Sequence, residues 1–270
     1  MPVVSRFLET SRKAAKEKPG VFALYVILCV IVAIVFVRSI FEGRYEHALL
    51  CLLVFILFWI PSMLERRFTV EIPSVLEGII LCFIFAAEIL GEIDAFYIKI
   101  PFWDTILHTT WGFLAAGIGF ALVDILNRSH ASRLQLAPIY MAITAFCFSM
   151  TAGAVWELFE YSMDVFVGFD MQKDTIVTAF SSVTLDPTNT NIAIPVDGIV
   201  STEIMLASGE TVVIPGGYLD IGLHDSMADL FVNLVGAAVF SIIGFIYVKN
   251  RGSKKSFATH FIPRLRNSAK

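Results

Sequence analysis

The sequence of 270 residues is 57% hydrophobic and only 16% charged, and its formal net charge at pH 7 is −4. Together with a mean hydropathy of +0.75, this balance excludes an ordinary soluble domain and favours a polytopic helical membrane protein. No nucleic-acid-binding motif accompanies the basic residues, so we expect no nucleic-acid partner.

Six apolar runs are long enough to cross a hydrocarbon core of about 30 Å. They cover residues 20–40, 46–64, 72–93, 103–126, 136–165 and 226–248. The predicted fold class is therefore an all-α integral membrane protein with six transmembrane helices. We expect a multi-pass protein of the cell membrane, plasma or inner, whose main partner is the lipid bilayer.

Lysine and arginine are divided unevenly among the segments between these runs. With the N-terminus inside, sixteen of the 20 fall in inner segments, whereas the outer loops hold only Arg44, Lys99 and Lys173. Because inner loops carry the excess of Lys and Arg in membrane proteins, the pattern predicts an N-in, C-in topology. Both ends of the chain are then basic and cytoplasmic.

The connection between the fifth and sixth runs differs from the rest of the chain. It is turn-rich and polar at 186–191, and it carries short apolar runs at 203–206 and 211–214 with Ser208-Gly209 between them. This pattern predicts a small β-containing, extracytoplasmic insertion with a hairpin. The expected parts of the chain are a basic cytoplasmic segment (1–19), five helices (20–165), the insertion (166–224), the sixth helix (225–248) and a basic cytoplasmic tail (249–270).

Ionisable residues recur at helical spacing within three of the predicted helices. The pairs are Asp104 and His108, Glu157 and Glu160, and Asp225 and Asp229. Residues three or four apart lie on one helix face, so each helix presents two groups in one direction. The predicted topology also places all three pairs in the outer half of the membrane. Because charge at membrane depth is costly, such residues face a protein interior or a wet cavity.

Five carboxylates and one imidazole without an equal number of cations cannot all remain ionised in a dry cluster, so some must be protonated or a cation must be bound. A divalent metal satisfies this requirement, and the oxygen-rich ligand set with one His suits Mg²⁺ or Mn²⁺, with Zn²⁺ also compatible. The predicted catalytic groups are Glu157 and His108. The predicted metal ligands are Asp104, His108, Glu160, Asp225 and Asp229.

Each motif also has a structural interpretation. Asp104 and Asp225 stand at predicted helix N-termini, where Asp is a favoured cap. Glu77 lies near the inner end of the third run, far from the outer cluster, and an acid there is what a proton-coupled carrier would use. Arg38, at the outer end of the first run, is either a snorkelling anchor or an anion-binding group.

These motifs resemble those of the YjdF-type inner-membrane protein family, in the same order. The resemblance rests on Trp103-Asp104-Thr105-Ile106-Leu107-His108 with Gly112-Phe113, on Trp156-Glu157-Leu158-Phe159-Glu160, and on Asp225-Ser226-Met227-Ala228-Asp229 with Gly236-Ala237. A looser likeness to VanZ-like membrane proteins rests on Asp104, His108, Glu157 and Asp229-x-x-x-Asn233-x-x-Gly236. The family has no firmly assigned activity, so the resemblance implies a shared site without naming its reaction.

The function predicted from these observations is a metal-assisted hydrolase or transferase that acts on a lipid or cell-envelope precursor. Its cofactor would be a divalent metal, Mg²⁺, Mn²⁺ or Zn²⁺. Two alternatives use the same residues differently. One is a transporter or proton-coupled carrier, and the other is a non-catalytic membrane scaffold or stress and resistance factor.

Overall fold

The computed structural model describes residues 15–67, 70–128, 136–250 and 257–265. Six helices in this part of the chain are long and apolar enough to span a membrane, which confirms the helical prediction. They are α2 (Pro19–Phe41), α3 (Tyr45–Arg67), α4 with its continuation η1 (Ser74–Phe85 and Ala86–Ile93), α6 (Trp103–Arg128), α7 (Pro138–Val167) and α8 (Leu223–Lys249).

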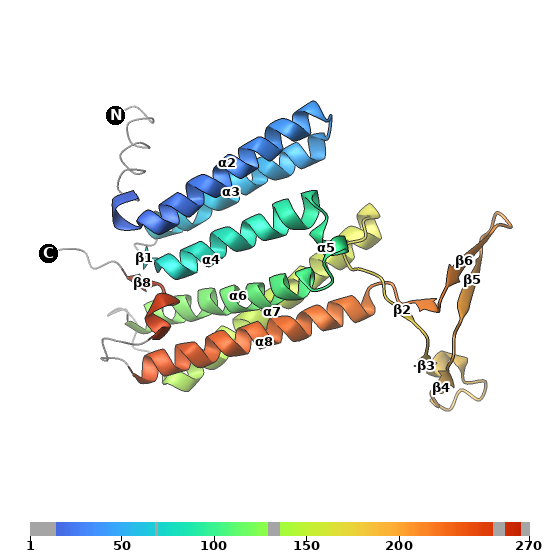
Figure 1. The fold of residues 1–270 in the computed structure, drawn as a ribbon. Coiled ribbons are helices and arrows are strands. Elements are labelled where there is room, and N and C mark those ends of the chain that lie inside the picture. The colour runs from blue at the N-terminus through green and yellow to red at the C-terminus, as the bar shows by residue number, and fades with distance from the viewer. Residues whose placement is uncertain (1–14, 68–69, 129–135, 251–256, 266–270) are drawn as a thin grey trace. The chain divides into compact units, whose positions relative to one another are not determined.

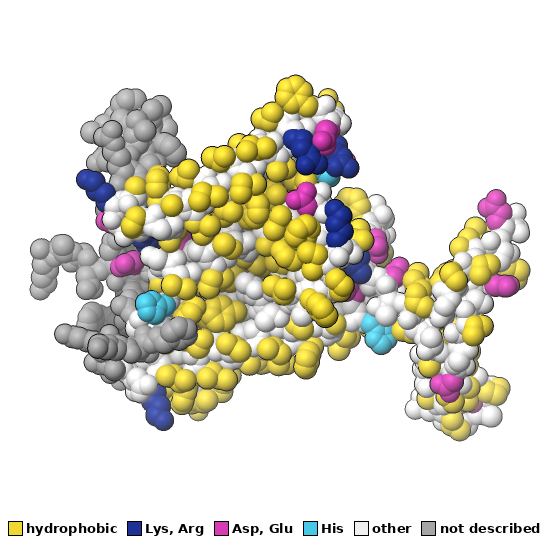
Figure 2. Space-filling view, viewed as in Figure 1, with side chains coloured by type: hydrophobic (Ala, Val, Ile, Leu, Met, Phe, Trp, Pro, Cys, Tyr) yellow, Lys and Arg dark blue, Asp and Glu magenta, His cyan; other side chains and the backbone are white. Residues whose placement is uncertain are grey.

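The chain forms two compact units. A helical unit comprises residues 1–153 and 232–270, and an insertion unit comprises residues 154–231. In the helical unit, many large apolar side chains on the long helices are exposed, such as Ile34 at 63%, Leu49 at 67% and Leu126 at 62%. Figure 2 shows apolar side chains across the visible face of these helices. An apolar exterior of this kind is the surface that a bilayer requires of a spanning protein.

Helices α2, α3 and α4 pack together through one apolar cluster (Figure 1). Pro19 begins α2 at a position where its missing N–H costs no helical hydrogen bond. Val32, Cys51 and Val54 are fully buried in the cluster. At the other end of α2, Gly43 takes a positive φ of 72°, which lets the chain turn sharply into α3.

The third long helix changes its hydrogen-bonding pattern as it continues from α4 into η1, which is a π-helix. The short helix α5 (Phe96–Lys99) follows. Trp103 Nε1 donates a hydrogen bond of 3.3 Å to the carbonyl oxygen of Ala86 in η1. This bond ties the first residue of α6 to η1 and so helps to fix the point where Asp104 stands.

Within the helical unit, α6, the first half of α7 and most of α8 share a second apolar cluster. Its fully buried members include Phe120, Met141 and Phe240. Aromatic rings meet edge to face in its centre, with 5.0 Å between the ring centroids of Phe113 and Phe240. Offset and edge contacts of this kind add to the stability that burial alone provides.

The end of the chain packs into the same cluster. A 3₁₀ turn, η3 (Phe257–His260), brings Ala258 and Ile262 to 4% and 0% exposure. The Phe261 ring lies 5.6 Å from that of Phe113. Strand β8 (Arg264–Leu265) then pairs antiparallel with β1 (Val70–Glu71). The sequence predicted only a basic tail here, and the structure adds a packed segment beneath the helices.

The insertion unit contains three two-stranded antiparallel sheets. β2 (Ile176–Val177) pairs with β7 (Tyr218–Leu219), and β3 (Phe180–Ser182) pairs with β4 (Ile194–Val196). β5 (Ser201–Met205) and β6 (Thr211–Pro215) form a hairpin whose turn contains Gly209 at φ 87°. The short 3₁₀ turn η2 (Val183–Leu185) lies between β3 and β4. The predicted β-containing region and its hairpin are therefore confirmed.

Candidate functional site

Three helices approach closely at one level of the helical unit, which we call the junction and define by Gly112 on α6, Gly153 on α7 and Asn233 on α8. A Cβ atom added to Gly112 would collide with the backbone of Asn233, and one added to Gly153 would lie 2.8 Å from Asn233 Nδ2. One turn deeper on α8, a Cβ atom on Gly236 would collide with the Thr109 carbonyl. Only glycine permits this approach, because small residues let helix backbones meet.

Polar contacts connect the same three helices at the junction. The Ser149 hydroxyl on α7 donates a 2.7 Å hydrogen bond to the Gly112 carbonyl oxygen. Asn233 Nδ2 donates a longer bond, 3.4 Å, to the Ser149 carbonyl oxygen. Ser149 and Asn233 are 0% and 1% exposed. The junction is thus tightly packed and partly polar at membrane depth.

Helix geometry relates the junction to the predicted site residues. His108 precedes Gly112 by four residues, Asp229 precedes Asn233 by four, and Glu157 follows Gly153 by four. Residues four apart lie on the same face about 6 Å along the axis. Each of these three residues therefore continues the helix face that carries its junction residue.

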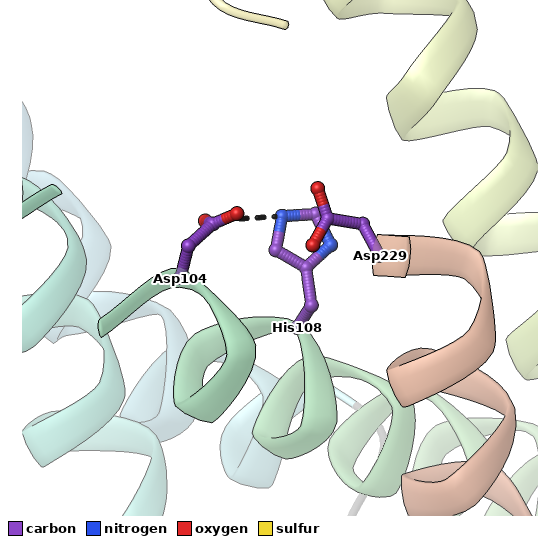
Figure 3. Close-up of side chains that lie close together, drawn as sticks. All are labelled: Asp104, His108 and Asp229. Carbon is purple, nitrogen blue, oxygen red and sulfur yellow. Dashed lines mark ion pairs between the residues drawn. The ribbon is translucent and has the colours of Figure 1, made fainter. Parts of the chain in front are cut away.

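Asp104 and His108 form a pair within α6, drawn in Figure 3. Asp104 Oδ1 lies 3.5 Å from His108 Nε2, and the side chains of Asp104 and His108 are 32% and 11% exposed. The i,i+4 spacing predicted from the sequence therefore produces the contact. Such a contact helps to orient the imidazole. It is not a strong ion pair, because the distance between the two atoms is long and the Asp104 side chain is partly exposed.

Asp229, on helix α8, is the third residue that lies close to this pair. It is 4% exposed, and it stands one turn from Asn233, whose backbone packs on Gly112. One ligand atom from each of Asp104, His108 and Asp229 lies within 4.8 Å of the others (Figure 3). We call these three residues the acid–imidazole group. It holds two carboxylates and one imidazole, and none of its members is a permanent cation.

The group fits a divalent ion by chemistry and by spacing. Metal–ligand distances of about 2.0–2.6 Å place ligands on opposite sides of an ion roughly 4–5 Å apart. The 4.8 Å limit lies within that range, at its upper end. Carboxylate and imidazole ligands suit Mg²⁺, Mn²⁺ and Zn²⁺.

The other predicted residues belong to the insertion unit. Glu157 and Glu160 on α7 are 7% and 8% exposed. Trp156 Nε1 donates a 2.9 Å hydrogen bond to Glu160 Oε1. Asp225, in the first turn of α8, accepts a 2.8 Å bond from the Lys173 backbone N–H. Among the residues described, these three acids are not part of the group with metal-ligand spacing.

Gln172 connects the two helix segments of the insertion unit. Its side-chain Nε2 donates to the hydroxyl of Ser226 on α8 and, at 3.5 Å, to the carbonyl oxygen of Glu157 on α7. The Asp164 carboxylate accepts bonds from the backbone N–H groups of Met171 and Gln172. Sequence reasoning missed Gln172, since a single Gln in a polar loop carries no distinguishing signal.

A second polar cluster, part-buried and also missed from the sequence, lies where the starts of α2 and α4 meet the end of α3. We call it the ammonium network. Lys18 Nζ lies 2.7 Å from Glu65 Oε1 and 2.5 Å from Glu77 Oε2, and it donates to the Ile72 carbonyl oxygen at 2.7 Å. Burial alone would lower the pKa of Lys18, but the hydrogen bonds with the two carboxylates outweigh it and raise that pKa. Glu77 is therefore one half of an ion pair.

Arg38 also has a partner. Its Nε lies 2.9 Å from Glu42 Oε1, four residues on, and both side chains are about half exposed. This is a surface pair at the end of α2, and it agrees with the anchoring role rather than with an anion site.

Comparisons with known proteins identify a family without an activity. Residues 23–250 match the sequence model of a family described as "Predicted membrane protein (DUF2238)". An uncharacterised protein of Thermotoga maritima is 27% identical over 124 residues, which cover 44% of this chain and 62% of that protein. No solved structure matches. The resemblance to VanZ-like proteins finds no support in these comparisons, and that to YjdF-type proteins stays a prediction.

Proposed function

The chain belongs to the DUF2238 family of predicted membrane proteins, and from its site we propose that it is a metal-dependent membrane enzyme, a hydrolase or transferase. Asp104, His108 and Asp229 hold one divalent ion. The observation that carries this proposal is the spacing of their ligand atoms, all within 4.8 Å of one another. Glu160 and Asp225 lie outside this group and serve as supports of its surroundings rather than as direct ligands.

Glu157 acts as the general base. It is buried at 7% exposure, and it stands one turn from Gly153, which packs on Asn233. The same step along α8 leads from Asn233 to Asp229. A buried carboxylate on this face is suited to taking a proton from an attacking water or hydroxyl group. His108, whose imidazole lies beside Asp104, would take part in the reaction through the ion that it holds.

The substrate class follows from the surroundings of the site. A bound divalent ion supplies a Lewis acid for a phosphoryl or acyl oxygen. The residues that hold it stand on membrane helices, so a substrate with an apolar tail could reach them from the bilayer. We therefore propose a lipid or an envelope precursor that carries a phosphate or an ester.

The site faces outward, and the topology is N-in, C-in. This proposal rests on the uneven distribution of Lys and Arg. Reporters placed at residue 190 should be extracytoplasmic, and reporters at residues 130 and 260 should be cytoplasmic. A cytoplasmic reporter at 190 would place the site on the inner side and overturn the outward orientation.

The position of Glu77 no longer favours the alternative of a proton-coupled carrier. Such a carrier needed an ionisable acid at the inner side, and Glu77 was the candidate. Because Glu77 lies 2.5 Å from Lys18 Nζ, its position is accounted for by a structural ion pair. The scaffold alternative becomes an outcome of the metal experiment below.

Metal content of the purified protein in detergent tests the proposal. Wild-type protein should carry about one divalent ion per chain, and EDTA should lower its melting temperature, because an ion that binds only the folded state stabilises it. His108→Ala and Asp229→Asn should each lose most of the ion, whereas His224→Ala, a histidine outside the group, should retain it. Wild-type protein with no stoichiometric ion, whose melting ignores EDTA, Mg²⁺, Mn²⁺ and Zn²⁺, would favour the scaffold alternative.

The catalytic part of the proposal has its own test. Glu157→Gln should retain the ion and lose turnover of a lipid phosphate or lipid ester, because the amide cannot accept the proton. If Glu157→Gln turned over such a substrate at the wild-type rate, Glu157 would not be the base.

A further inference from the structure

Asn233 has a buried acceptor atom that the described residues leave without a hydrogen-bond partner. Its Oδ1 is inaccessible to solvent, and the residue as a whole is 1% exposed. The other end of the same carboxamide, Nδ2, donates hydrogen bonds to the Ser149 carbonyl oxygen at 3.4 Å and to Met150 Sδ at 3.5 Å. A buried acceptor of this kind is costly unless water or a ligand satisfies it.

The orientation of helix α8 directs this side chain toward the acid–imidazole group. Side chains on a helix lean toward its N-terminus, and the N-terminal direction from Asn233 leads to Asp229, one turn away. Gly153 packs against one side of the carboxamide, with its potential Cβ position 3.2 Å from Oδ1. The backbone of Asn233 packs against Gly112, one turn below His108.

We propose that Asn233 is a positioning residue, whose Oδ1 accepts a hydrogen bond from a water molecule coordinated to the ion. This inference rests on the metal site proposed above. One helical turn of about 6 Å leaves room for one water between an ion at the level of His108 and Asp229 and the carboxamide below it. The ion is then one that retains water ligands, as Mg²⁺ and Mn²⁺ do.

The consequence for the reaction is orientation of the nucleophile. A coordinated water that donates one proton to Asn233 Oδ1 is held in a fixed direction, with its other proton available to the general base. Partners that hydrogen-bond to metal ligands in this way typically change metal affinity by about 10–100-fold when they are removed.

Two substitutions at the same position separate this role from a packing role. Asn233→Leu has a similar shape but lacks both the acceptor and the donor. Because it removes a costly unsatisfied oxygen along with the long 3.4 Å bond to Ser149, it should melt no lower than wild type in EDTA. It should bind Mn²⁺ about 10–100-fold more weakly. Asn233→Asp keeps an acceptor but buries a carboxylate at a site that is 1% exposed, so it should melt lower in EDTA but should keep or strengthen Mn²⁺ binding. Binding is measured as the Mn²⁺-dependent shift in melting temperature.

Ser241→Ala is the matched control. Ser241 lies on the same helix, and its hydroxyl is also buried without a partner among the described residues, but it is two turns farther from the group. This variant should keep the full Mn²⁺ shift. If Asn233→Leu also keeps the full shift, the proposal is wrong while the metal site stands. If wild type shows no shift, the metal site itself fails.

Discussion

The ammonium network and the acid–imidazole group are both polar clusters at helix ends of an apolar protein, but their charge balance differs. In the ammonium network one lysine meets two carboxylates and a backbone oxygen, and the side chains of Lys18, Glu65 and Glu77 are only 14–17% exposed. In the acid–imidazole group two carboxylates surround one imidazole, which carries charge only when protonated.

This difference separates a structural cluster from a site. A lysine ammonium fills the centre of the first cluster and joins three helices, so the chain supplies its own cation. The second cluster offers the same kind of oxygen ligands without a permanent cation, and the junction beneath it brings an unsatisfied amide oxygen to the same region. Buried acids of this kind need a proton or a bound cation.

The largest effect is expected from removing the lysine of the ammonium network. Lys18→Met leaves two part-buried carboxylates close together without their cation and should lower the free energy of unfolding by about 3 kcal/mol. Arg38→Met, at an exposed pair, should change it by less than about 0.5 kcal/mol. Chemical denaturation in detergent measures both. Equal effects of the two variants would show that the ammonium network contributes no more than a surface pair.

The glycines around the junction should tolerate no side chain. Gly236→Ala puts a Cβ atom against the Thr109 carbonyl and should cost about 2 kcal/mol, because α6 and α8 must separate. Gly20→Ala is the control, since nothing lies within 4 Å of its potential Cβ atom. That variant should be neutral or slightly stabilising. A Gly236→Ala protein that melts like Gly20→Ala would contradict the close approach beneath the group.

The two clusters should also respond differently to chelator. Glu65→Gln should lower stability by about 1–2 kcal/mol with or without EDTA, because its partner is a lysine of the chain. Asp104→Asn should change stability by less than about 1 kcal/mol in EDTA, since its contact with His108 is long and partly exposed. With Mn²⁺ present it should lose most of the ion-dependent stabilisation. Thermal melts of both variants under both conditions provide the comparison.

The features predicted from sequence are those that depend on local patterns. The long apolar runs correctly predicted the six helices, and the short apolar runs around Ser208-Gly209 correctly predicted the β5–β6 hairpin. The contact of Asp104 with His108 follows from i,i+4 spacing alone. The approach of Asp229 was predicted only by combining helix spacing with a topology inferred from Lys and Arg.

What the sequence could not predict are pairings between distant residues. Lys18 counts as one more inner charge in a topology argument, and nothing in its neighbours indicates that it meets Glu65 and Glu77, 47 and 59 positions away. The final segment is equally ambiguous, because basic residues surround the few apolar ones that pack beside Phe113. Tertiary contacts decide both cases, and no local propensity encodes them.

Asp186 in the insertion unit provides a third way to accommodate a carboxylate, with neither lysine nor metal. It accepts hydrogen bonds from the N–H and hydroxyl of Thr188, at 2.9 and 2.6 Å, and from the N–H groups of Thr190 and Ile192. The hydrogen bonds from Thr188 lower the pKa of Asp186 most, well below its ordinary value of 3.8.

A carboxylate whose pKa is depressed in the folded state contributes stability above its ordinary pKa, and that stability is lost as the pH falls below 3.8 toward the folded value. The loop at 186–192 should therefore lose hydrogen-exchange protection, corrected for the intrinsic rate, between pH 5 and strongly acidic solution. Asp186→Asn should remove this pH dependence, whereas Asp197→Asn should retain it. Because the loop closes only local bonds, the melting temperature of the long helices should not change. A loop whose protection is constant down to pH 2 in the wild type would mean that Thr188 and Thr190 hold it without the charge.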